Sequence, residues 1–287
     1  MANRDLPLDG KLVVITGASR GIGRAIAERL AAAGAEIVAA ARTLKADGDR
    51  GSAEETAALI RSRGGKASAM PVDMEDGASR AALIKGVIDR FGRIDVLVNN
   101  AGTAAYTKTD EMPLATAESQ IATYFTGPWH LSSLVLPHMK AAGQGRILNI
   151  GSCAVLPPTL PYADYNAARG NETLYAACKA ASHRLAQGLA AEVHDQNIAV
   201  NVIAPVGAIY TPGLASLGLG ITPDMPIFEP IEDIAEAALH MLEQPLGYTG
   251  QVEYSYQFLD RIGRSTRSLD GAAVMKERTP AEAEANA

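Results

Sequence analysis

Hydrophobic residues along this chain fall into two alternating patterns. Short apolar runs such as KLVVITG (11–17) end at glycine, and the segment that follows places Ile22, Ile26 and Leu30 at helical spacing. The same alternation continues almost to the end of the chain. It predicts strands at 11–17, 36–42, 66–73, 94–102, 145–152, 198–206 and 250–259, and helices at 22–34, 52–65, 79–92, 114–140, 172–194 and 231–242.

The predicted strands are continuously apolar, which is typical of a parallel sheet that helices cover on both faces. No long linker or shift in composition divides residues 1–263. We therefore expect an α/β fold, a single doubly wound Rossmann-like domain whose mostly parallel sheet has about seven strands. Residues 264–287 show little hydrophobic periodicity and predict a polar C-terminal tail, either mobile or in contact with a partner.

Composition narrows the function classes. The chain has a net charge of −6 and no basic block, which argues against a nucleic-acid partner. No apolar run reaches membrane-spanning length, and the first residues lack the apolar core of a signal peptide. Cys153 and Cys178 form neither a disulfide framework nor a metal pattern. We expect a cytoplasmic protein that binds no nucleic acid, membrane or metal.

A glycine-rich loop, TGASRGIG, lies between the first predicted strand and the first predicted helix. Gly17, Gly21 and Gly23 are spaced so that the chain can turn tightly, approach a pyrophosphate and pack the helix on the strand. The helix start then supplies amide donors and the positive end of a dipole. Glycines that only punctuate a turn are the alternative, but the position within the first βα unit favours dinucleotide binding.

Three motifs in the same order resemble the short-chain dehydrogenase/reductase family: TGASRGIG, then NNAG (99–102), then YAACK (175–179). The resemblance covers about residues 9 to 255. It implies a Rossmann-like oxidoreductase that acts on a small carbonyl or alcohol substrate and assembles as a homodimer or homotetramer. The cofactor-binding residues that it implies are Gly17, Ser19, Arg20, Gly21, Ile22, Gly23, Arg42, Asp73, Met74, Asn100, Ala101, Gly102, Tyr175, Lys179, Pro205, Ile209 and Thr211.

The end of the second predicted strand bears on which nicotinamide cofactor is used. A carboxylate there would bind the ribose hydroxyls of NAD and repel a 2′-phosphate. This chain has Ala41 followed by Arg42, and a second cation, Arg20, lies within the glycine loop. A guanidinium pairs with phosphate through charge-assisted hydrogen bonds. We expect NADP(H), with two solvated surface arginines as the alternative.

Tyr175 and Lys179 form the candidate acid/base pair. A tyrosine is a poor base near neutral pH unless a neighbouring cation favours its phenolate, and a lysine four residues later lies on the same helical face. By resemblance, Lys179 also binds the nicotinamide ribose. Ser152, at the end of the fifth predicted strand, matches the serine that orients the substrate oxygen. The predicted catalytic residues are Ser152, Tyr175 and Lys179.

A second tyrosine, Tyr165, competes for this role. Counting from Ser152 at the family's usual spacing reaches Tyr165, but Arg169 would be its partner and stays charged, so it cannot join a proton relay. Downstream, Pro205 lies 30 residues after Tyr175, the family's usual distance, and 40 after Tyr165. Because lengthening a surface loop costs little, we interpret Tyr165 as part of an insertion before Tyr175.

Tyr124 and the insertion before Tyr175 favour a second hypothesis, and the segment after Pro205 is a further departure from the family pattern. Tyr124 stands in YFTGP where the family usually has an asparagine that holds a water near the lysine; its phenol could hold that water or fill its space. The segment PVGAIYTP, which begins at Pro205, carries one residue more than the family pattern. By resemblance, Ile209 and Thr211 contact the nicotinamide carboxamide, and the extra residue leaves this alignment open by one position. The alternative to an enzyme is a catalytically weak NADP-binding regulator or scaffold of the same fold.

Overall fold

The structure, a computed structural model, describes residues 6–45, 51–163, 171–215 and 222–279. Within these ranges a parallel sheet of seven strands has the order β3-β2-β1-β4-β5-β6-β7. The sequence-based prediction of a single doubly wound Rossmann-like domain is therefore confirmed. The strands are β1 (Leu12–Thr16), β2 (Glu36–Ala41), β3 (Lys66–Pro71), β4 (Val96–Asn99), β5 (Gly145–Ile150), β6 (Ile198–Ala204) and β7 (Val252–Tyr254).

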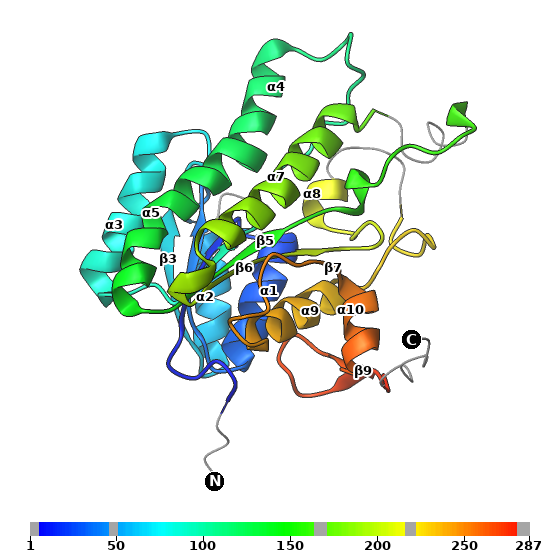
Figure 1. Ribbon diagram of the computed structural model, residues 1–287. Coiled ribbons are helices and arrows are strands. Elements are labelled where there is room, and N and C mark those ends of the chain that lie inside the picture. The colour runs from blue at the N-terminus through cyan, green and yellow to red at the C-terminus, as the bar shows by residue number, and fades with distance from the viewer. Residues whose placement is uncertain (1–5, 46–50, 164–170, 216–221, 280–287) are drawn as a thin grey trace.

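Helices cover the sheet on both faces (Figure 1). One layer contains α1 (Gly21–Ala32), α2 (Ala53–Ser62), α9 (Ile231–Glu243) and α10 (Ser255–Ile262), and the other contains α3 (Gly77–Phe91), α5 (Gly127–Ala142) and α7 (Thr173–Glu192). Helix α4 (Leu114–Ile121) continues through a π-helical turn, Ala122–Thr126, into α5, and the short α8 (Pro212–Ala215) follows β6. Of the helices in the described ranges, none is both long and apolar enough to cross a lipid bilayer.

The core lies on both sides of the sheet because alternate residues of each central strand face opposite layers. In β1, Val13 and Ile15 pack toward α1 and α9, whereas Leu12 and Val14 pack toward α3 and α5. All five residues of this strand are fully buried. Two-sided burial explains why the strands read as continuous apolar runs in the sequence.

Local contacts decide where α2 and α7 begin and where the last strand of the sheet ends. A capping box of Ser52 and Glu55 begins α2, with both reciprocal hydrogen bonds. At α7, Glu172 is the N-cap residue and its side chain makes no capping hydrogen bond, and Asn171 before it adopts a left-handed φ of 68°. The last predicted strand, 250–259, ends at Tyr254, because Phe258 and Leu259 pack into the core as part of α10.

Residues 264–279 differ from the polar tail expected there. They form β8 (Thr266–Arg267) and β9 (Val274–Lys276), an antiparallel pair beside α9 and α10 (Figure 1). Arg278 is buried, and its guanidinium pairs with Asp233 at 2.9 Å and with Asp260 at 2.6 Å. Long-range ion pairs rather than an apolar face hold this segment, so hydrophobic periodicity gives no sign of it. Residues 280–287 lie outside the described ranges.

Replacing Arg278 with alanine should lower the free energy of unfolding by ~3–5 kcal/mol, because Asp233 would stay buried without its partner. Urea unfolding followed by circular dichroism measures the loss. Arg61 pairs with Glu54 at the surface and provides the matched control: Arg61→Ala should cost at most ~1 kcal/mol. If both variants lose the same small amount, residues 264–279 do not belong to the folded domain.

Candidate active site

Three glycines let the loop after β1 fold tightly against its neighbours. Gly17 and Gly21 have φ values of 69° and 56°, in the left-handed region that glycine adopts most easily. A Cβ atom on Gly17 would lie 2.7 Å from the Cα of Ala101, and one on Gly23 would lie 2.4 Å from the Gly17 carbonyl oxygen. Larger residues would therefore separate the loop from β4 and from its own helix.

The amino end of α1 is open to an anion. Arg20 precedes the helix in an extended conformation, and its side chain makes no capping hydrogen bond. The first amides of a helix have no acceptor within it, and the helix dipole adds partial positive charge at that end. The N–H groups of Gly21, Ile22 and Gly23 therefore suit a phosphate. Ser19 completes the loop, and its carbonyl oxygen packs against Gly51, 2.8 Å from where a Cβ there would lie.

Thr16 joins the glycine loop to the NNAG segment. Its hydroxyl oxygen accepts hydrogen bonds from the backbone N–H groups of Asn100 and Ala101, both at 3.1 Å. The Asn100 carboxamide donates to the Thr16 carbonyl at 2.9 Å and to that of Gly17 at 3.3 Å. Asn100 and Ala101 thus fix the loop on β4. Thr16 was missed by the sequence-based list, although its place directly before Gly17 was a signal.

Arg42, Asp73 and Met74 lie at the carboxyl ends of β2 and β3. The Arg42 guanidinium is largely exposed and lies 3.5 Å from the carboxylate of Glu75, a residue that the sequence did not single out. The Asp73 carboxylate accepts the Glu75 N–H at 2.9 Å. Met74 is buried, with its side chain near Gly127. Arg42 is thus an accessible cation beside one carboxylate.

Ser152, Tyr175 and Lys179 meet at the carboxyl end of β5. The Ser152 side chain lies close enough to the Tyr175 phenol to lower its pKa, and the Ser152 Oγ accepts the Ala154 N–H at 3.1 Å. The Lys179 ammonium donates to the carbonyl of Ile150 at 2.7 Å. The backbone N–H of Ser152 donates to Nε2 of His183 at 3.4 Å, one turn beyond the lysine. The three predicted catalytic side chains therefore share one site, and His183 supports the serine.

Burial dominates the protonation of this site. It raises the pKa of Tyr175, an effect that nearby Tyr106 strengthens and the Ser152 side chain opposes. It lowers the pKa of Lys179 to about 8. Burial and the charge of Lys179 lower the pKa of His183 to about 4, so its ring is neutral and Nε2 can accept the hydrogen bond from the Ser152 N–H. The Lys179 ammonium, which the sequence predicts to lower the Tyr175 pKa, lies 5.9 Å from the centroid of the Tyr175 ring.

Two further tyrosines surround Tyr175. The Tyr106 ring lies edge-on to it with centroids 5.8 Å apart, and the Tyr124 ring does the same at 5.3 Å. Tyr124 comes from the π-helical turn, and its ring lies directly over Gly102. Tyr165 and Arg169, the competing pair, lie outside the described residues.

The segment after β6 reaches back to the glycine loop. The Thr211 methyl lies 3.2 Å from where a Cβ on Gly21 would be, and Ile209 is buried. Pro205, half-buried, begins the segment. The buried carboxylate of Glu229 accepts the N–H groups of Val206 and Gly207 at 2.7 and 3.2 Å. Glu229 was missed by the sequence-based list; an acid inside the apolar run IFEPI was the only hint.

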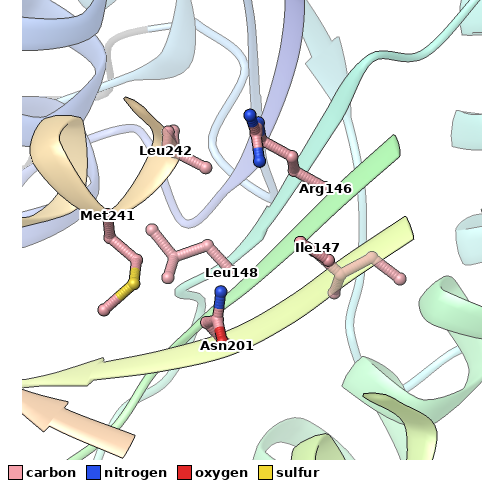
Figure 2. Close-up of a pocket in the computed structure, with 7 residues that line it drawn as sticks. Arg146, Ile147, Leu148, Asn201, Met241 and Leu242 are labelled. Atoms are coloured by element: carbon pink, nitrogen blue, oxygen red, sulfur yellow. The ribbon is translucent and has the colours of Figure 1, made fainter. Parts of the chain in front are cut away.

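A small cavity lies at some distance along β5 from these residues. Its volume is about 10 Å³, enough for roughly one water molecule. Figure 2 shows Leu148 and Asn201 on neighbouring strands facing Met241 and Leu242 of α9 around it. It is too small for a substrate. Among the described residues, no cluster of three or more His, Cys, Asp or Glu side chains is arranged to hold a metal ion.

Comparison with known proteins finds a matching family profile and similar curated sequences. The short chain dehydrogenase family profile matches residues 11–219. A 7alpha-hydroxysteroid dehydrogenase of Escherichia coli strain K12 is 36% identical over 264 residues, which cover 88% of this chain and 95% of the relative.

Two solved structures share the fold. A 7alpha-hydroxysteroid dehydrogenase complexed with NADH and 7-oxo glycochenodeoxycholic acid has a TM-score of 0.74 and 35% identity, covering 88% of this chain and 96% of that one. A metagenomic short-chain oxidoreductase in complex with NADP has a TM-score of 0.68 and 30% identity, covering 86% and 97%. With a matching family profile, sequence relatives along most of its length and this fold, the chain belongs to the short-chain dehydrogenase family of oxidoreductases.

Proposed function

We propose that this protein is an NADP(H)-dependent oxidoreductase that interconverts a secondary alcohol and a ketone by hydride transfer, with Tyr175 as the acid/base. One observation carries the proposal: Ser152, Tyr175 and Lys179 meet at the carboxyl end of β5. The resemblance to hydroxysteroid dehydrogenases supports a reaction at a CH–OH group.

The residues around the glycine loop fit a dinucleotide. Gly17 and Gly23 let the loop pack closely on Asn100 and Ala101, and the amino end of α1 suits the pyrophosphate. Arg42 would pair with the 2′-phosphate, which makes NADP(H) the cofactor we propose. Relatives with NADP and with NADH are both known, so this choice rests on Arg42 and Arg20. When bound, NADPH supplies the hydride.

Tyr175 is suited to give a proton to a ketone oxygen. Because burial raises its pKa, its hydroxyl is protonated at neutral pH. The Ser152 hydroxyl, which lies beside the same phenol, orients the substrate oxygen. His183 holds the serine backbone, so the oxygen-binding side of the site is rigid. The alcohol-oxidising direction needs the phenolate, and a closer approach of the Lys179 ammonium would favour it.

The surface beside the site supports an apolar substrate. Large apolar side chains are exposed on the segments that follow β5 and β6, namely Leu156, Leu160, Tyr162, Tyr210 and Ile227. Exposed apolar side chains on the segments that follow the catalytic strand ends suit the binding of an apolar molecule. We propose an apolar alicyclic ketone or alcohol, and a hydroxysteroid like the relatives' substrate is the first to try.

Assembly and location are part of the proposal. Leu114, Ile121 and Trp129 are exposed on α4 and α5, and an apolar surface there suits a homodimer or homotetramer. Cys153 and Cys178 form no disulfide with each other, which supports a reducing, cytoplasmic location.

A catalytically weak NADP-binding regulator is the second candidate. The observation that favours it is the position of Lys179, whose ammonium bonds to the Ile150 carbonyl and lies over the Tyr124 ring, 4.7 Å from its centroid. In this arrangement the lysine does not assist Tyr175.

Tyr175→Phe should lower kcat at least ~100-fold while NADPH affinity stays nearly unchanged, because the variant loses only the proton donor. NADPH oxidation at 340 nm with a panel of ketones, hydroxysteroid-derived ones included, measures turnover. Tyr165→Phe is the control and should stay active. Full loss in Tyr165→Phe with an active Tyr175→Phe would reverse the assignment. Strong NADPH binding by the native protein, with no turnover of any ketone, would favour the regulator.

Arg42→Asp should reverse the cofactor preference by weakening NADPH binding ~10- to 100-fold, the effect of losing a charge-assisted hydrogen bond. NADH, which lacks the 2′-phosphate, should bind as well as before or better. Titration calorimetry with both cofactors measures the ratio. Arg61→Asp makes the same charge change at another exposed ion pair and should leave the ratio unaltered. A preference for NADPH that survives Arg42→Asp would remove Arg42 from the phosphate site.

A further inference from the structure

Lys179 is a buried ammonium with an aromatic partner. Its side chain is 7% exposed, and only the carbonyl of Ile150 accepts its hydrogen bond among the contacts of the described residues. On another side, Nζ lies 4.7 Å from the centroid of the Tyr124 ring, within the range of a cation–π contact. The Tyr175 ring is farther away, at 5.9 Å.

Tyr124 is held in this position by an irregular helix. The turn Ala122–Thr126 is π-helical, and the N–H of Gly127 bonds to the carbonyl of Ala122 five residues earlier. Such turns insert one extra residue into a helix, and they are frequent at functional sites. Here the turn carries the Tyr124 ring to the interface between α7 and the end of β4.

The ring also fills the space beside the lysine. A Cβ atom on Gly102 would lie 2.1 Å from Cε1 of Tyr124, so the ring packs directly on the glycine backbone. Its other neighbours are the Tyr175 ring, at 5.3 Å between centroids, and the lysine. With 6% of its surface exposed, Tyr124 separates the ammonium from solvent on this side.

We propose that Tyr124 is a positioning residue whose ring takes the place of water as a partner of the Lys179 ammonium and thereby sets the charge state of the lysine. The inference deepens the proposed function, since it concerns the same site. It also answers the question that the sequence leaves open, because the phenol fills the space by its ring.

The pKa shifts of Tyr124 and Lys179 agree with this proposal, because they predict a neutral phenol beside a lysine that titrates near pH 8. Burial raises the pKa of Tyr124, so its phenol carries no charge at neutral pH. Burial lowers the pKa of Lys179 to about 8, and Cys178 opposes this effect. The lysine is thus mostly charged at pH 7, and the charge is lost as the pH rises through 8. The other titratable groups around the site are Tyr106, Cys153, Glu172, Tyr175 and His183.

If the Tyr124 ring is the partner of the ammonium, each of three substitutions at Tyr124 should have a different effect on the Lys179 pKa. Tyr124→Phe keeps the ring and should leave the Lys179 pKa within ~0.3 units of native. Tyr124→Leu keeps a dry neighbour but removes the π face, so the pKa should fall by ~0.5 units or more. Tyr124→Asn removes the bulk, admits water and adds a carbonyl acceptor, so the pKa should rise by ~1 unit or more.

The pKa of Lys179 is measurable without turnover, by NMR of the full chain with ¹³C-labelled lysine, using Lys179→Met to assign the signal. The same variants are titrated for NADPH affinity from pH 6 to 10, where the affinity should change at the pH of the lysine. Circular dichroism checks folding, and if Tyr124→Asn fails to fold, the comparison of Phe with Leu still decides. A protein that reduces no ketone yet shows these shifts would contradict only the proposed function.

A shift in Tyr124→Phe as large as in Tyr124→Asn would overturn the proposal, because the hydroxyl rather than the ring would then be the partner. Unchanged lysine titration in both Tyr124→Leu and Tyr124→Asn would also overturn it, since Tyr124 would only pack. Shifts of opposite sign in these two variants, with Tyr124→Phe like native, are the result we expect.

Discussion

Every functional group of this protein depends on the parallel sheet, which brings the carboxyl ends of β1, β4 and β5 to one edge. At that edge the Thr16 hydroxyl binds two amides of the NNAG segment and holds the glycine loop against β4. Ser152 follows the end of the next strand, β5, and lies beside Tyr175. Because parallel strands are buried on both faces, their ends are among the few places where polar side chains can gather.

Two buried cations of this fold, Arg278 and Lys179, have different partners. Arg278 is surrounded by carboxylates, so its charge is balanced and the hairpin it belongs to is part of the structure. Among the described residues, the Lys179 ammonium contacts the carbonyl of Ile150 and the ring of Tyr124 rather than a carboxylate, and burial lowers its pKa to about 8. A buried ammonium whose pKa is close to neutral contributes little to the stability of the fold. Such lowered pKa values are common at sites of proton transfer. Arg278 is therefore a structural cation, whereas the Lys179 ammonium fits the reactive role that we propose for it.

Local patterns in the sequence are enough to predict the sheet, most helices and the motifs at strand ends, since each depends on neighbouring residues. The glycine loop and the pair Tyr175 and Lys179 are of this kind. Contacts between distant residues are not predictable in this way. Arg278 finds Asp233 across 45 positions, and the carboxylate of Glu229 binds amides 22 and 23 residues earlier. The aromatic partner of Lys179 likewise depends on a π-helical turn that no simple periodicity reveals.

The central claim is that this site carries out hydride transfer and proton donation. Single-turnover stopped flow tests it most directly: NADPH mixed with excess protein and an alicyclic ketone, followed at 340 nm, with a pH indicator in weak buffer. The account predicts that NADPH absorbance is lost in proportion to the ketone reduced, with one proton taken up per NADPH oxidised. Bound NADPH whose absorbance stays constant with every ketone tested would contradict it.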